Sequence, residues 1–85
     1  MKKKQGKLAK YLNSHFNRRC EERIGELLPR KDIIRRIQSC KSYDDLYFIS
    51  KQSNTRSKYA FIFNGTLYHL IYDKIRHKLV TILYA

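Results

Sequence analysis

The sequence has 85 residues and a formal net charge of +12 at pH 7. A chain of this length forms one domain, which excludes an enzyme that needs a separate substrate domain. Its 42% hydrophobic content excludes the disordered class, and its charge favours a polyanionic partner, of which nucleic acid is the commonest. Residues 1–41 carry 13 Lys and Arg against 4 acidic residues, and residues 42–85 carry 6 against 3, so the first half is the expected docking face.

The chain begins with a basic segment, MKKKQGK, followed by a helix-prone region. We predict a flexible basic tail over residues 1–7 and a single domain over residues 8–85. Residues 7–28 favour helix, although LNS at 12–14 is a candidate break with Ser14 as the N-cap of a second piece. The predicted apolar stripe of that second piece consists of Phe16, Cys20, Ile24 and Leu27.

A second helix is predicted after Pro29, which ends the first. Asp32 is the expected N-cap of this helix, and the helix is expected to run to about residue 41. Its inward residues are expected to be Ile33, Ile34, Ile37 and Cys40.

Four short runs rich in aromatic and β-branched residues follow, at 46–50, 59–63, 67–72 and 79–84. Asn64-Gly65 separates the second and third runs and predicts a type I′ hairpin turn, because both residues tolerate positive φ. We therefore predict an α+β fold in which two N-terminal helices pack on one face of a four-stranded antiparallel sheet, in the order ααββββ.

Cys20 and Cys40 are the only cysteines, and two thiols cannot supply a structural zinc site. We predict that both are buried free thiols in a reducing compartment, with a disulfide as the alternative. The basic start is not followed by the continuous apolar run of a signal peptide, and no run reaches the length of a membrane span. A cytoplasmic protein without membrane contact is expected.

Several enzyme classes lack their motifs in this sequence. It has no glycine-rich phosphate loop, no GxSxG, no HExxH and no Cys/His zinc spacing, and its seven acidic residues are scattered. We expect neither a metal nor another cofactor. RNA cleavage without metal needs only a proton acceptor, a proton donor and cations that stabilise the phosphorane.

The stretch SHFNRRCEER places His15, Arg19 and Arg23 at i, i+4 and i+8, in one row along a helix. The guanidinium groups of arginines in such a row can donate paired hydrogen bonds to phosphate oxygens. The alternative is a solvated basic edge, which is common in a protein of this charge.

The same stretch resembles the opening helix signature, roughly S-H-x-x-x-R-x-x-E-R, of a family of small bacterial and phage domains related to the RelE and ParE toxins. The family is more distantly related to the barnase and colicin ribonucleases. The matching positions are Ser14, His15, Arg19, Glu22 and Arg23. The final strand pair, YHLIYDKIRHKLVTILY, is similar too.

This resemblance implies a metal-independent endoribonuclease in which His15 is the general acid or base, Arg19 and Arg23 hold the scissile phosphate, and Thr81 helps to position it. The residues Arg18, Arg35, Arg36, Arg56 and Lys58 are further candidate RNA contacts. The alternatives are a capping role for His15, cover of the core edge by Arg23 and an ordinary strand position for Thr81. A ribosome, an antitoxin or a host protein is a further expected partner.

One face of the predicted sheet has no helix to cover it, yet its strands are apolar on both sides. If several tyrosines emerged there, they could stack RNA bases; the candidates are Tyr47, Tyr59, Tyr68, Tyr72 and Tyr84. A partner protein or a homodimer covering that face is the alternative. Two functions stay open: the toxin-like endoribonuclease, and a non-enzymatic module that binds nucleic acid or inhibits a host protein, with a phage origin as one alternative.

Overall fold

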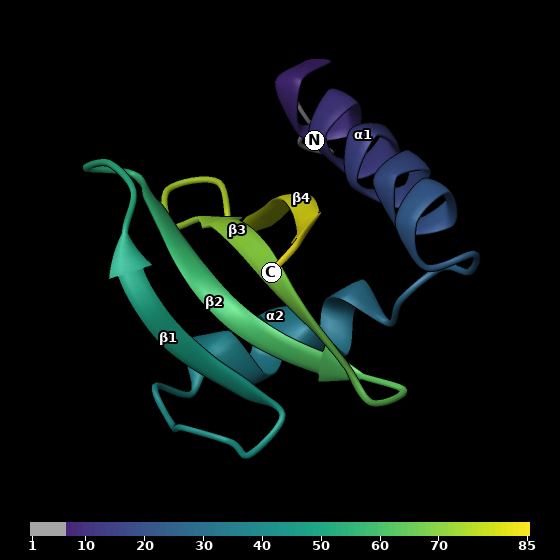
Figure 1. Cartoon of the computed structure of the whole chain (residues 1–85). Helices are drawn as coiled ribbons and strands as arrows, with labels where there is room; N and C mark the ends of the chain where they lie inside the picture. Colours follow the sequence, from purple (N-terminus) through teal and green to yellow (C-terminus); the bar gives the residue numbers. More distant parts are fainter. Residues whose placement is uncertain (1–6) are drawn as a thin grey trace.

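Residues 7–85 fold as two helices followed by a four-stranded antiparallel sheet, as the computed structural model in Figure 1 shows. Backbone is described for residues 7–85 and side chains for residues 13–85. The elements are α1 (Lys7–Arg23), α2 (Arg30–Gln38), β1 (Leu46–Lys51), β2 (Arg56–Phe63), β3 (Thr66–Asp73) and β4 (Lys78–Tyr84). The predicted ααββββ order is confirmed. The predicted tail lies outside the described residues except for Lys7, where α1 begins.

The strands follow one another across the sheet in the order β1-β2-β3-β4, each antiparallel to its neighbour. Asn64 and Gly65 join β2 to β3 with φ of 51° and 78°, the positive values that a type I′ turn requires. Strand β2 begins at Arg56, earlier than predicted, because the polar residues Arg56, Ser57 and Lys58 continue the ladder with β3.

Helix α1 is continuous through LNS, so the predicted break with Ser14 as N-cap is wrong. The helix also ends earlier than predicted, at Arg23. Gly25 has a φ of +88°, and its amide donates to the carbonyl oxygens of Cys20 and Glu21, both at 3.1 Å. This left-handed residue closes the last turn of the helix, as glycine commonly does after a C-terminus.

Helix α2 begins at Arg30, with Pro29 rather than Asp32 as its N-cap. Asp32 lies in the first turn, where it forms an ion pair with Arg35. Neither described helix is long and apolar enough to cross a membrane.

The two cysteines lie in different environments, and both are free. Cys20 is buried as predicted, and burial raises the pKa of its thiol to about 11. Cys40 is exposed, so its predicted burial is wrong. The reason is that α2 ends at Gln38 and the chain turns away through Cys40, which has a φ of 60°.

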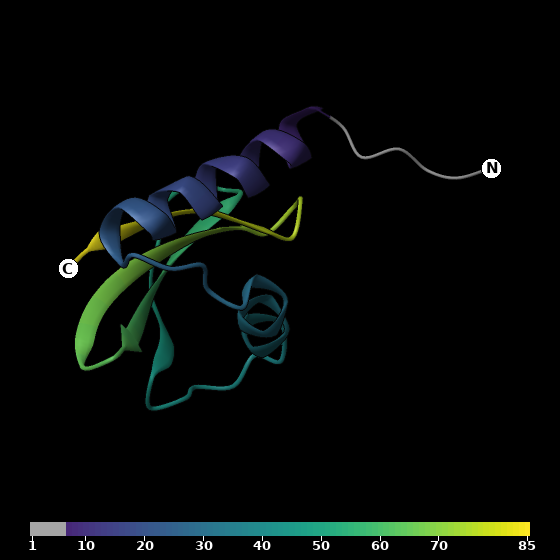
Figure 2. The ribbon, with the colours of Figure 1, turned by 90° about the vertical axis from the view of Figure 1, so that its right-hand side faces the viewer.

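A single main core lies between the helices and one face of the sheet. Figure 2 shows α1 lying along the β4 side of the sheet. Helix α2 is set apart from α1 by the loop that connects the two helices. The core takes Phe16 and Cys20 from α1, and Ile33 and Ile37 from α2. The strands contribute Leu46, Phe61, Tyr68, Leu70, Tyr72, Leu79 and Ile82. Leu27, expected in the apolar stripe of α1, is 55% exposed because it follows the end of the helix.

The opposite face of the sheet is not covered by either described helix. Ile71 and Val80 form a small separate cluster there. Around them lie exposed apolar side chains, which strand alternation and register assign to this face: Tyr47, Ile49, Ile62, Leu67 and Leu83.

Candidate nucleic-acid interface

The basic row on α1 is present as a structural feature. One continuous helix carries His15, Arg19 and Arg23, with Arg18 beside them. Arg19 Nη1 donates a hydrogen bond of 2.7 Å to Glu22 Oε1, which holds this guanidinium along the helix surface. The backbone carbonyl of Arg23 accepts a 2.9 Å hydrogen bond from the Tyr84 hydroxyl, so the end of the row is tied to the end of β4. We call His15, Arg18, Arg19 and Arg23 the cationic edge.

The surroundings of His15 lower the pKa of its imidazole. The pKa of His15 is lowered from its ordinary value of 6.5, first by burial and then by the positive charges of Arg19, Arg18 and Arg23. Glu22 acts in the opposite direction and does not cancel them. His15 is therefore largely neutral at neutral pH, in the form that can accept a proton, within the field of three guanidinium groups.

The fold does not bring Thr81 to the basic row on α1. It is paired with Ile71 in the β3–β4 ladder, next to the fully buried Ile82, which faces the core that α1 shares. Because side chains alternate across a strand, Thr81 belongs to the opposite face. There it lies in one cross-sheet line with Ile71 and Lys58.

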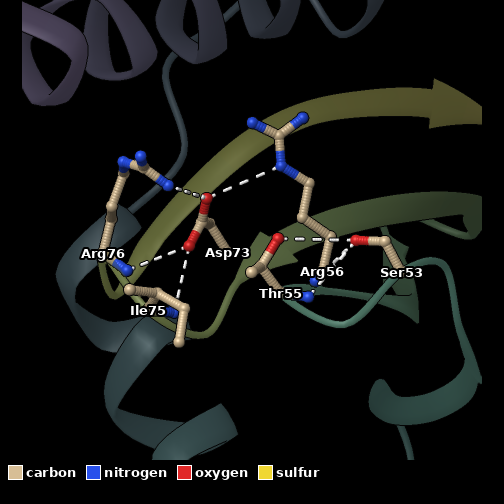
Figure 3. Close-up of polar contacts among 6 residues, drawn as sticks. All are labelled: Ser53, Thr55, Arg56, Asp73, Ile75 and Arg76. Carbon is tan, nitrogen blue, oxygen red and sulfur yellow. Dashed lines mark hydrogen bonds and ion pairs between the residues drawn. The ribbon is translucent and has the colours of Figure 1, made fainter.

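Arg56 belongs to a polar network at the end of the sheet, drawn in Figure 3. Its Nε lies 3.6 Å from Asp73 Oδ2, and Arg76 Nη1 donates to the same oxygen at 3.1 Å. Asp73 Oδ1 accepts from the amides of Ile75 and Arg76 at 3.0 and 2.9 Å. The Asp73 side chain is 0% exposed, so this buried carboxylate offsets part of the charge that Arg56 was expected to offer RNA.

The two predicted contacts on α2 differ in their surroundings. Arg35 is 78% exposed and paired with Asp32. Arg36 is 20% exposed, paired with Asp45, and its Cζ lies 4.5 Å from the centroid of the Tyr43 ring. Arg35 can reach a phosphate from this position, whereas Arg36 chiefly joins α2 to the segment before β1.

The surface hollows in the described part of the chain include two that are lined by neither His15, Arg19 nor Arg23. The first, of about 500 Å³, lies between the end of α1 and the start of α2. Its charged lining comes from Arg30, Lys31, Asp32 and Arg35. The second, of about 340 Å³, lies between the segment after α2 and the strands β1 and β2. We call this second hollow the aromatic cleft, because Phe48 and Tyr59 line it.

The tyrosines do not form the predicted platform on the open face of the sheet. Tyr68 and Tyr72 are buried in the main core, and Tyr59 packs against that core from the same side. Of the five candidates, register assigns only Tyr47 to the open face. The aromatic surface lies instead at the cleft, where Phe48 is 55% exposed, a residue that the sequence did not single out.

Within residues 7–85, no group of three or more His, Cys, Asp and Glu side chains is placed to hold a metal ion. No protein-family model matches the sequence, and neither the curated proteins nor the solved structures contain a significant match. The resemblance to RelE-like domains therefore stays a prediction.

Proposed function

We propose that this protein is an RNA-binding module that docks phosphates on the cationic edge of α1. The observation that carries the proposal is geometric: one continuous helix gathers Arg18, Arg19 and Arg23 beside His15, and their charges add to burial in lowering the pKa of its imidazole. Such a concentration of positive charge attracts the phosphate backbone, and arginine forks suit phosphate geometry. The net charge of +12 supports the same partner.

The test compares RNA affinity after charge removal at two places. Arg18→Gln with Arg23→Gln removes two charges from the cationic edge, and Lys31→Gln with Lys74→Gln removes two exposed charges elsewhere. Fluorescence anisotropy with a labelled single-stranded RNA should show a roughly three- to thirtyfold loss for the first pair, since each solvent-exposed ion pair contributes about 0.3–1 kcal/mol. The control pair should lose much less. Equal losses for both pairs would contradict a localised interface.

A second function, metal-independent RNA cleavage, is favoured by the position of His15 in one helical row with Arg19 and Arg23, where burial and the nearby arginines lower the pKa of its imidazole. A neutral imidazole can take the proton of a ribose 2′-hydroxyl while that oxygen attacks the adjacent phosphorus. The P–O5′ bond then breaks, the 5′-oxygen takes a proton from water, and a 2′,3′-cyclic phosphate remains. In this scheme Arg19 and Arg23 stabilise the charge that develops on the phosphorane oxygens.

Cleavage is tested on total RNA in EDTA, with His15→Gln and Arg19→Gln beside the wild type. Loss of cleavage in folded variants supports the catalytic role of His15. Because a base is active only when unprotonated, the rate should rise with pH and level off above the lowered pKa of His15. Undiminished cleavage by His15→Gln contradicts this role and leaves the binding function in place.

A further inference from the structure

The aromatic cleft is open because α2 is short. The helix ends at Gln38, and the segment of Cys40, Lys41 and Ser42 turns past β1 without covering Phe48. Phe48 pairs with Tyr59 in the β1–β2 ladder, so both belong to the face of the sheet that carries the core. A phenylalanine that shares this face but stays 55% exposed lines a recess at the margin of the core.

The rings in the cleft are held in fixed relative positions. Phe48 and Tyr59 meet edge to face, with centroids 5.7 Å apart and an interplanar angle of 80°. Tyr59 meets Tyr72 in the same way, at 6.4 Å and 87°. The Tyr72 hydroxyl accepts a 3.2 Å hydrogen bond from Gln38 Nε2 and lies 3.3 Å from His77 Nδ1, so its ring cannot move freely. The result is a preformed aromatic surface of which Phe48 is the exposed member.

Polar and charged groups surround this surface. Burial, with smaller contributions from Tyr72 and Cys40, raises the pKa of Tyr59, so its hydroxyl stays protonated at neutral pH and can donate a hydrogen bond. Lys41 lines the cleft, and the register of β1 with β2 assigns the exposed Lys51 to the same face as Phe48. One cation therefore lines the cleft, and a second lies on the same strand and the same face of the sheet as Phe48.

We propose that the aromatic cleft binds an unpaired nucleobase of single-stranded RNA. Phe48 stacks on the base, Tyr59 contacts its edge, and Lys41 and Lys51 bind the adjoining phosphates. Proteins that bind single strands combine these two elements, an aromatic ring for the π-face of a base and cations for the backbone. A double helix offers no free base face, so the cleft selects single strands. This inference rests on the proposed RNA-binding function and adds the class of RNA.

The experiment compares Phe48→Ala with wild type. Each protein is titrated separately into a labelled single-stranded oligouridylate, a double-stranded RNA and inorganic polyphosphate. Phe48→Ala should weaken single-strand binding about five- to hundredfold, because one stacked base contributes about 1–3 kcal/mol. Binding to the other two probes should not change. Phe48→Trp should restore affinity, and Ile62→Ala, which removes a side chain of 38% exposure from the opposite face, is the matched control.

A direct readout separates this inference from the proposed function. In NMR titrations with uridine 5′-monophosphate, the ring protons of Phe48 and Tyr59 should shift, whereas those of Phe61, which is 4% exposed, should not. If the Arg18/Arg23 variant weakens binding, Phe48→Ala leaves single-strand affinity unchanged and the nucleotide shifts neither ring of the wild type, the cleft proposal is overturned and the cationic edge stands. If Phe48→Ala weakens single-strand binding and the Arg18/Arg23 variant does not, the cleft stands and the cationic edge fails. Equal loss on all three probes by Phe48→Ala also overturns base recognition.

Discussion

Asp73 shows how one residue joins two distant loops. Its carboxylate contacts Arg76 in the β3–β4 loop and Arg56 at the start of β2. In the same place the Lys74 amide donates to the Thr55 carbonyl oxygen at 2.7 Å. The sequence shows Asp73 only as the residue after the predicted strand at 67–72, because the approach of Arg56 depends on the register between β2 and β3.

We predict that Asp73→Asn lowers the free energy of unfolding by about 2–4 kcal/mol, because it leaves buried donors and two guanidinium groups without their charged partner. Urea denaturation measures the change. Asp44→Asn, the same substitution at an exposed acidic residue, should stay within about 0.5 kcal/mol of wild type. A loss as large in Asp44→Asn would show that general charge, not this network, is responsible.

The effect of Asp73 should depend on pH. Burial alone raises the pKa of the carboxyl, but hydrogen bonds from the amides of Arg76 and Ile75 and from the Arg76 guanidinium outweigh it and lower the pKa below 3.8. A depressed pKa means that the stabilisation is complete above the unfolded value and is lost as pH falls through the folded value. The difference between wild type and Asp73→Asn should therefore shrink below about pH 4. A difference that stays constant down to pH 3 would contradict this origin.

At the scale of elements, the limits of α1 depend on one glycine. A sequence reading based on periodicity extended the helix to residue 28, although Gly25 is the residue type that typically follows a helix C-terminus. Local hydrogen-bonding preference likewise suggested a cap at Ser14, where the apolar contacts of Phe16 and Cys20 with the sheet keep the helix continuous. Asn64-Gly65 was predictable because a two-residue turn depends on local φ alone.

Gly25→Ala is expected to destabilise the protein by about 1–2 kcal/mol, the penalty of a left-handed conformation for an L-residue. A Cβ at this position would meet nothing within 4 Å, so no clash adds to the penalty. Thermal denaturation followed by circular dichroism measures the shift. Ser14→Ala is the companion variant: inside a helix it should be neutral or slightly stabilising, whereas loss of an N-cap would destabilise by about 1 kcal/mol.

At the scale of the molecule, the layer order and the basic row were predictable, and the cleft was not. The row arises from i, i+4 spacing within one helix, which the sequence shows directly. Thr81 and Phe48 depend on strand register and on where α2 stops, and both are long-range properties. The resemblance grouped Thr81 with His15 in one site, whereas strand register assigns Thr81 to the face of the sheet opposite α1, and the sequence passed over Phe48.

The net charge leads to a prediction about salt. RNA affinity should fall by orders of magnitude between about 50 and 200 mM salt if six or more phosphates are contacted, because each contact releases condensed counterions. The Arg18/Arg23 variant should show a shallower slope in a plot of log affinity against log salt concentration. A flat response in the wild type would remove nucleic acid as the partner.

The bulge in β1 has a consequence for self-assembly. The pairing of β1 with β2 shifts between Phe48 and Ser50, beside Ile49, and β1 is an edge strand of the sheet. An edge that carries exposed Tyr47, Phe48 and Ile49 is the kind of template on which strands of other chains add and amyloid-like stacking begins. The irregular spacing of backbone groups at Ile49 interrupts that template, so the edge can display aromatic side chains without recruiting further strands.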